Sequence, residues 1–143
     1  MQDITALNGY RFDELKIGMS AVYSRTITDT DLRNFSGVTG DTNPMHLNEE
    51  YAKNTFFKGR IVHGFLTAGL LSTVIGTKLP GPGCIYVSQT LQFKAPVYVD
   101  DTVYARATIT KLIPEKRRVI LQTQCSVKDT IVLDGEAVVQ LPA

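Results

Sequence analysis

The sequence predicts a single α+β domain in which an antiparallel sheet packs against one long apolar helix. Its 143 residues suit one domain with a hydrophobic core, so we expect residues 1–143 to form one unit. Residues 61–77 are mostly apolar and contain no Asp, Glu, Lys or Arg, and four later segments are rich in β-branched and aromatic residues. Helices followed by consecutive strands are typical of a fold whose helix covers one sheet face.

A strand and a short helix are the first elements that the pattern predicts. Residues 20–28 alternate β-branched and aromatic residues with polar ones, which indicates a strand. Thr28 and Asp31 have the spacing of a capping box, so a helix should begin there. We expect this helix to end near Gly37.

A turn-rich loop, residues 39–44, separates this helix from the next one. Asn48 can cap a second short helix, and Glu49 and Glu50 favour the positive end of its dipole. This helix should extend to about Asn54.

The long apolar helix is expected to be wrapped by the rest of the fold. As a helix, residues 61–77 would span roughly 26 Å at 1.5 Å per residue, which is short of a bilayer core of about 30 Å. The Pro-Gly-Pro-Gly run at residues 80–83 should end it. The segment therefore predicts a buried helix, with no membrane partner.

The last part of the chain is expected to form four consecutive antiparallel strands. The predicted strands cover residues 85–97, 102–112, 119–127 and 131–141. They are separated by turn-like residues 100–101, 114–116 and 128–129.

Composition excludes several classes of function. The net charge of +1 comes from 15 basic and 14 acidic residues without a basic block, so no nucleic-acid partner is expected. The two cysteines, Cys84 and Cys125, form no CxxC pair and favour reduced thiols. The N-terminus lacks the basic start and apolar run of a signal peptide, so a cytoplasmic location is expected.

The loop before Asn48 carries the residues best suited to chemistry. It places Asp41 five residues before His46, with Gly40 and Asn43-Pro44 restricting the backbone between the helices. A carboxylate and a neutral imidazole that converge on one water can perform acid–base catalysis near neutral pH. Alternatively, Asp41 is a turn residue and His46 a packing residue. The local pattern does not decide between these interpretations.

No metal or dinucleotide site is expected. The chain has only two histidines, and no cluster of His, Cys and acidic residues has the spacing of a metal site. No glycine-rich phosphate loop follows a strand. We interpret the second histidine, His63, as a structural residue near the start of the helix, with a side chain directed away from the site.

Several segments carry a resemblance to a known family. They are residues 40–46 (GDTNPMH) flanked by Phe35 and Ala52, residues 61–64 (IVHG), and residues 80–83 followed by Tyr86, Ser88, Gln89, Phe93 and Pro96. Together they resemble the MaoC-like proteins from about residue 15 to residue 141, in the same order and with similar spacing. Met45 stands where the family more often has Leu, Ile or Val, a volume-conserving difference.

The resemblance implies a hot-dog fold, in which an antiparallel sheet wraps around the long central helix, and a homodimer whose sheets join edge to edge. It is closest to the single-domain (R)-specific enoyl-CoA hydratases. Asp41 and His46 would then activate the water that is added to trans-2-enoyl-CoA, giving (R)-3-hydroxyacyl-CoA. Coenzyme A is part of that acyl-CoA substrate, and no separate cofactor is expected.

Three further residues enter the predicted site. Gly64, in the first turn of the apolar helix, offers a backbone N–H for the thioester oxyanion, as the family implies, or serves close helix–sheet packing. Ser72 shares its helix face and is expected to support the site, or to bond its own helix carbonyl. Asn43 could hold the water or stabilise the loop. Lys58 and Arg60 could meet coenzyme A phosphates, but we leave them outside the site.

Other activities stay open at this point. The same residues could serve a 3-hydroxyacyl-carrier-protein dehydratase. A hot-dog thioesterase would cleave the thioester instead, but the intact loop motif argues against it. A non-catalytic acyl-CoA-binding subunit fits least, because both catalytic positions are present. Polyhydroxyalkanoate supply and fatty acid metabolism are both compatible with the leading hypothesis.

Overall fold

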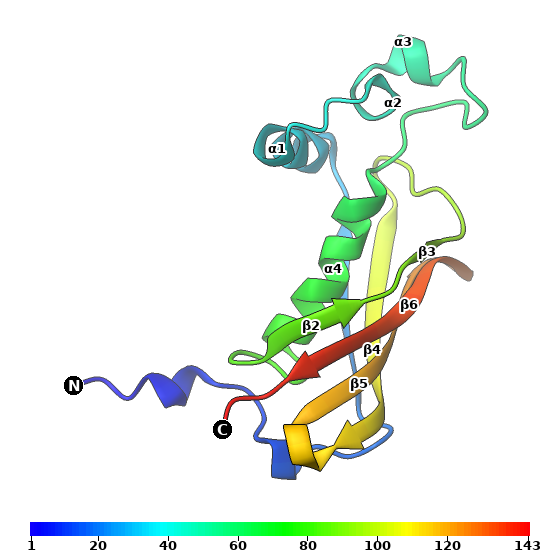
Figure 1. Ribbon diagram of the computed structural model, residues 1–143. Helices are drawn as coiled ribbons and strands as arrows, with labels where there is room; N and C mark the ends of the chain where they lie inside the picture. The colour runs from blue at the N-terminus through cyan, green and yellow to red at the C-terminus, as the bar shows by residue number, and fades with distance from the viewer.

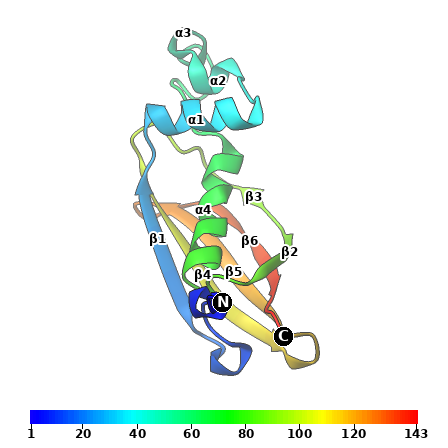
Figure 2. The same cartoon turned by 90° about the vertical axis from the view of Figure 1, so that its left-hand side faces the viewer.

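The strands form one antiparallel sheet whose curved face holds the long helix α4, Gly64–Thr77 (Figures 1 and 2). The computed structural model describes residues 1–143. The strands are β1 Ser20–Thr26, β2 Ile85–Gln89, β3 Gln92–Phe93, β4 Thr102–Ile113, β5 Arg118–Val127 and β6 Thr130–Gln140. Their order is β1-β4-β5-β6-β2, with β3 also paired to β6. The predicted α+β class is confirmed.

Alternation along the strands gives the sheet one apolar face. In β4, Val103, Ala105, Ala107 and Ile109 are buried, whereas the side chain of Tyr104 faces solvent. In β5 the buried residues again fall at every second position, as the period of a strand requires. The helix α4 packs mainly against β4, β1 and β5 and closes this core.

The helix α4 begins three residues later than predicted. Residues 61–63 are extended, because Ile61 forms an isolated β-bridge with Tyr98 and the N–H of Val62 donates to the carbonyl of Val97 at 2.7 Å. No helix in the structure combines the length and apolar character needed to cross a membrane.

One side of α4 is open, which corrects the expectation that the helix is wrapped on all sides. Leu71, Val74 and Ile75 are fully buried against the sheet. Phe65 is 67% exposed, and Ser72 also lies on an exposed position of the helix. Within this single chain, the sheet therefore covers only part of the helix surface.

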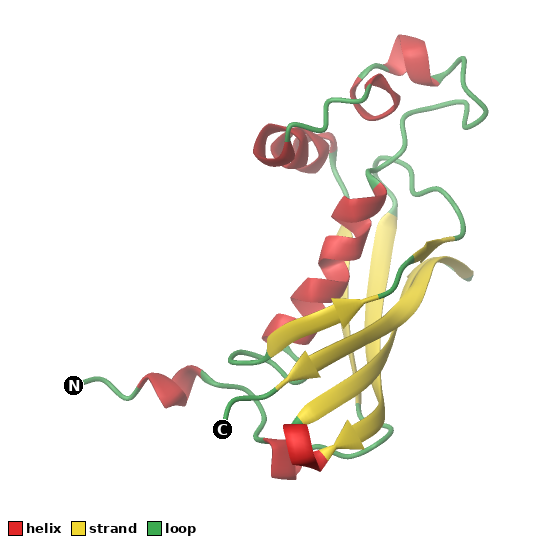
Figure 3. Cartoon of the chain, in the orientation of Figure 1, coloured by secondary structure: helices red, strands yellow, loops and turns green.

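Residues 29–60 form a helical lobe beyond the end of the sheet, above the N-terminus of α4 (Figure 3). Its helices are α1 Asp29–Thr39, α2 Pro44–Leu47 and α3 Glu49–Ala52. The predicted capping box is confirmed, since the Thr28 hydroxyl accepts from the N–H of Asp31 and the Asp31 carboxylate accepts from the N–H of Thr28. The helix passes Gly37 and ends at Gly40, whose φ of 81° is left-handed.

Two other predictions on secondary structure needed correction. The predicted strand over residues 85–97 is divided into β2 and β3 and ends at Phe93; the regular ladder breaks between the two, where the Thr90 hydroxyl accepts from the N–H of Glu136 in β6. The one-turn helix α2 was not expected, although its start has a local cause: Pro44 occupies the first turn, and the Asn43 side chain accepts from the N–H of Met45. Asn48 caps α3 as predicted.

Three short 3-10 helices lie outside these elements. They are η1 Ile4–Leu7, η2 Phe12–Glu14 and η3 Pro114–Lys116. The last of them is the turn between β4 and β5 that the sequence predicted. The two cysteines are free, with Cys125 buried in the core.

Candidate active site

The helix α2 presents His46 with one ring nitrogen fixed and the other available. His46 is only 8% exposed, and its Nδ1 lies 2.7 Å from the carbonyl oxygen of Ile61. A carbonyl oxygen only accepts hydrogen bonds, so Nδ1 must carry the proton that it donates. The Nε2 lone pair is therefore free to accept a proton from a reacting water.

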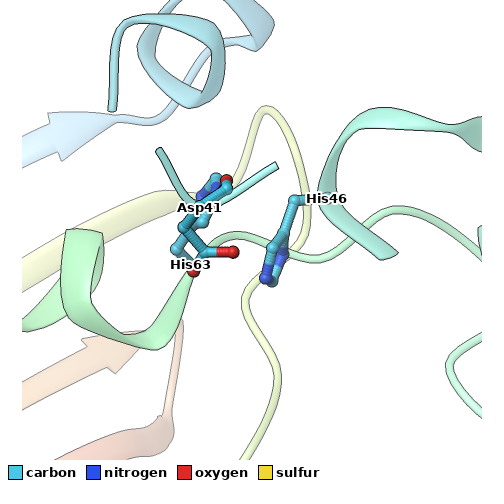
Figure 4. A group of neighbouring side chains, drawn as sticks. All are labelled: Asp41, His46 and His63. Carbon is cyan, nitrogen blue, oxygen red and sulfur yellow. The ribbon is translucent and has the colours of Figure 1, made fainter. Parts of the chain in front are cut away.

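Asp41 lies at the start of the loop between α1 and α2, where its side chain is exposed. Its backbone N–H donates to the Thr39 hydroxyl, and one carboxylate oxygen accepts from the N–H of Asn43 at 3.4 Å. The carboxylate, His46 and His63 converge from the loop, α2 and the start of α4 (Figure 4), with one side-chain atom of each within 4.8 Å of the others. The structure thus brings together Asp41 and His46, and their catalytic role stays a prediction.

His63 is part of this group, which corrects its interpretation as a residue directed elsewhere. Its ring stacks on that of His46, with centroids 3.9 Å apart and planes inclined by 28°. Its Nε2 lies 3.1 Å from the backbone carbonyl of Asp41. Burial is the main cause that lowers the pKa of His63, and the neighbouring His46 lowers it further, against the hydrogen bond to Asp41.

Ser36 and Phe35, from the last turns of α1, complete the surroundings of His63. The Ser36 hydroxyl lies 3.1 Å from His63 Nε2, and the Phe35 ring centroid lies 4.8 Å from that of His63. Ser36 was not among the site residues predicted from the sequence. A signal existed, because Ser36 lies one turn after Leu32 on the buried face of α1, where a hydroxyl needs a partner.

Arg60 fixes the backbone of His46 and forms an ion pair with Asp29. Its Nε donates to the His46 carbonyl at 2.7 Å, and its terminal nitrogen bonds the Asp29 carboxylate in α1. The nearby Arg33, followed by Arg60, keeps the pKa of Asp29 below its usual value. Arg60 therefore joins α1, α2 and the segment that leads to α4. Lys58 is exposed, with a φ of 62°.

Gly64 is the first residue of α4, and the helix N-terminus above it is open. The first amides of a helix have no acceptor within that helix. In α4 they also lack a side-chain cap, because the N-cap residue His63 makes no capping bond. A Cβ on Gly64 would lie 2.6 Å from the Phe93 ring, so only glycine fits there without movement. Gly64, Thr67 and Phe93 help to line an apolar cavity of about 410 Å³.

The other two predicted site residues have different positions. The Asn43 oxygen accepts from the N–H of Met45, which supports its interpretation as a residue that stabilises the loop. Ser72 lies two turns along α4 on its exposed side and makes no hydrogen bond with residues 40–46 in this chain. The serine that bonds a site residue is Ser36. A supporting role for Ser72 stays a prediction.

Metal binding by this group would require a change in its hydrogen bonds. Asp41, His46 and His63 lie close enough together to offer three ligands, an arrangement that the sequence spacing did not indicate. However, the His63 Nε2 proton is donated to the Asp41 carbonyl, and Nδ1 is buried without a partner. The free groups that remain are the Asp41 carboxylate and His46 Nε2, a pair suited to proton transfer to and from water.

The chain belongs to the family of proteins with a MaoC-like domain, since the family model matches residues 14–132. It is 52% identical to the (R)-specific enoyl-CoA hydratase of Rhodospirillum rubrum over 92% of both chains. It is 49% identical to the 3-hydroxybutyryl-CoA dehydratase of Methylorubrum extorquens over 92% of this chain and 83% of that protein.

A solved structure of an R-hydratase is also similar to this chain. The unliganded R-hydratase PhaJ1 from Pseudomonas aeruginosa superimposes with a TM-score of 0.90 at 40% identity, over 95% of this chain and 88% of that one. Together with the antiparallel sheet around α4, this similarity confirms the expected hot-dog fold.

Proposed function

We propose that the protein is an (R)-specific enoyl-CoA hydratase that adds water to trans-2-enoyl-CoA and forms (R)-3-hydroxyacyl-CoA. The observation that carries this proposal is the Asp41–His46 pair, held beside the open N-terminus of α4. The hydratase of Rhodospirillum rubrum, at 52% identity, supports both the reaction and its stereochemistry. The same residues would catalyse the reverse reaction, the dehydration of a 3-hydroxyacyl thioester.

In the proposed mechanism, the free Nε2 of His46 accepts a proton from a water that the Asp41 carboxylate orients. The water oxygen bonds to C3 of the substrate, and the electron pair of the double bond moves toward C2 and the thioester oxygen. The Gly64 N–H, at the positive end of α4, stabilises the negative charge on that oxygen. Transfer of the proton held by His46 to C2 completes the addition and restores the neutral imidazole, so the balanced reaction needs only water besides the acyl-CoA.

The proposed substrate agrees with the surroundings of Gly64. The cavity of about 410 Å³ beside it is lined mainly by apolar side chains, including Phe57, Val97 and Leu133. Pockets of this size and character hold small apolar ligands with a few polar groups to orient them. An acyl chain next to the helix N-terminus would leave its thioester near the Gly64 amide.

A homodimer is part of the proposal. The strand β2 ends the sheet, so one of its edges has no partner strand in this chain. Its Ile85 and Val87 are 59% and 44% exposed, and Phe65 on the open side of α4 is 67% exposed. An exposed apolar edge favours pairing with another strand, and a second copy joined through β2 would cover it. Light scattering on the purified protein should give the mass of two chains.

The test of the activity is an assay with crotonyl-CoA that follows enoyl absorbance and free thiol together. We expect the absorbance to fall without thiol release, and chiral chromatography to identify the (R)-3-hydroxy product. Thiol release would indicate a thioesterase, and no change in either signal would indicate a binding subunit. A much higher rate on crotonyl-carrier protein would favour the carrier-protein dehydratase.

Two variants test the assigned residues. Asp41→Asn keeps the shape of the side chain without its charge, and His46→Gln removes the proton-accepting ring. Each should reduce turnover by about 10²- to 10⁴-fold, the usual contribution of general acid–base catalysis. A rate near that of the wild type in either variant would remove that residue from the mechanism.

We further infer a cytoplasmic location, which the two free cysteines support.

A further inference from the structure

The three groups of the proposed site lie on three separate elements. Asp41 is in the loop after α1, His46 is in α2, and Gly64 begins α4. Catalysis requires a fixed distance between the acid–base pair and the oxyanion donor, because misplacement by about 1 Å can reduce a rate about 10²-fold. Some contact must therefore hold the helical lobe in register with the end of α4.

His63 makes this contact with all three groups. It is bonded covalently to Gly64, its ring stacks on His46 with centroids 3.9 Å apart, and its Nε2 lies 3.1 Å from the Asp41 carbonyl oxygen. The side chain is 1% exposed, so its position is fixed by packing. We propose that His63 is a positioning residue that holds the acid–base loop in register with the oxyanion-binding end of α4.

The hydrogen bonds of His63 determine its tautomer. The Asp41 carbonyl can only accept, so Nε2 carries the proton, and the Ser36 hydroxyl at 3.1 Å shares it. The other nitrogen, Nδ1, is buried without a partner, so a second proton there would have no acceptor and would place a charge out of reach of solvent. The ring is therefore neutral, which allows the stacked His46 to take up a proton without a second positive charge beside it.

The inference rests on the proposed hydratase function, and the variants are chosen to separate the two. His63→Phe keeps a flat ring for the stack but lacks the N–H that holds the Asp41 carbonyl. His63→Gln lacks the ring but can place an N–H near the position of Nε2. Val119→Ala, in a fully buried position of β5 far along the chain from the site, is a control for loss of stability alone.

We expect His63→Phe to lower kcat by about 10- to 100-fold, because misplacement of a catalytic group by about 1 Å can reduce a rate about 10²-fold, with little change in KM. His63→Gln should recover most of this loss, and Val119→Ala should keep the wild-type kcat while lowering the melting temperature. A residue with only a structural role would lower the melting temperature without changing kcat. A kcat of His63→Phe within twofold of an active wild type would overturn the inference, whereas an inactive wild type would overturn the proposed function.

A second measurement does not depend on activity. Long-range nitrogen–proton NMR correlation at neutral pH should show His63 as the neutral tautomer with its proton on Nε2. The neutral tautomer with its proton on Nδ1 would mean that the bond to the Asp41 carbonyl does not exist, and the inference would fail whether or not the enzyme is active.

Discussion

Replacing Gly64 with alanine would place a methyl group at the open N-terminus of α4. The new Cβ would lie 2.6 Å from Cε1 and 2.9 Å from Cδ1 of Phe93, whereas ordinary contacts begin at 3.4 Å. The Phe93 ring would therefore have to withdraw by about 0.8 Å, the difference between 3.4 and 2.6 Å. This movement is possible because Phe93 is 53% exposed and lies in a strand of only two residues.

The expected effect on stability is small. Alanine is favoured over glycine in a helix by up to about 1 kcal/mol, and the displaced ring offsets this gain. We expect the free energy of unfolding of Gly64→Ala to stay within about 1 kcal/mol of the wild-type value.

The expected effect on activity is larger. Removing an oxyanion donor typically reduces kcat by about 10²- to 10³-fold. Alanine keeps the N–H but narrows the space through which a thioester oxygen reaches it. We therefore expect kcat/KM to fall by about 10- to 100-fold, which corresponds to about 1.4 to 2.7 kcal/mol.

The crotonyl-CoA assay and thermal unfolding followed by circular dichroism would measure both effects. Phe93→Ala and the double variant Gly64→Ala/Phe93→Ala are the matched controls, because the double variant relieves the clash but keeps the methyl group beside the amide. We expect the double variant to stay slower than Phe93→Ala. A kcat/KM of Gly64→Ala within twofold of the wild type would refute the reasoning that the thioester oxygen reaches the Gly64 amide through the space that the methyl group fills.

Three other predictions concern the lobe and the core. Arg60→Met should lower the free energy of unfolding by about 1.5–3 kcal/mol and kcat by about tenfold, because the His46 carbonyl loses a charged donor. Urea unfolding and the hydratase assay would measure these two effects, and unchanged values would contradict the prediction. Because burial lowers the pKa of His63, the unfolded chain binds more protons than the folded one below about pH 6.5. The free energy of unfolding should therefore fall with decreasing pH, by at most about 1.4 kcal/mol per pH unit from this group. Urea unfolding at several values between about pH 7.5 and about pH 5 should show that this free energy depends less on pH in His63→Phe. Leu71→Ala removes a fully buried side chain and should lower the free energy of unfolding by about 2–5 kcal/mol, with kcat unchanged at temperatures below thermal unfolding. A loss under about 1 kcal/mol would mean that α4 is not packed against the sheet as described.

Features with local causes were predictable from the sequence. The capping box at Thr28 and Asp31 involves neighbouring residues, and it forms as expected. The strands after residue 100 follow from the period of buried positions. The pair Asp41 and His46 lies in one short segment, and its resemblance to the MaoC-like proteins favoured a catalytic interpretation that the local spacing left open.

Features with distant causes were not predictable in the same way. His63 meets Ser36 and the Asp41 carbonyl across 27 and 22 residues of sequence, and only the fold determines that contact. Helical periodicity placed Ser72 on one face of α4, but periodicity does not say what lies opposite that face. The helix start at Gly64 also depends on a distant partner, since the pairing of residues 61–62 with 97–98 competes with helix formation.

The residues proposed for proton transfer and the residues of the hydrophobic core lie in different parts of the chain. Of the 22 buried residues in the hydrophobic core, only Leu32 lies within residues 29–60. The groups proposed for proton transfer therefore lie in a segment that contributes little to the core, and polar contacts of Arg60 and His63 attach that segment. The usual conflict between activity and stability is weaker for the proton-transfer step, because Asp41 and His46 are not part of the hydrophobic core. The proposed acyl cavity does not share this separation, because Val97 and Leu133 line it and also belong to the hydrophobic core.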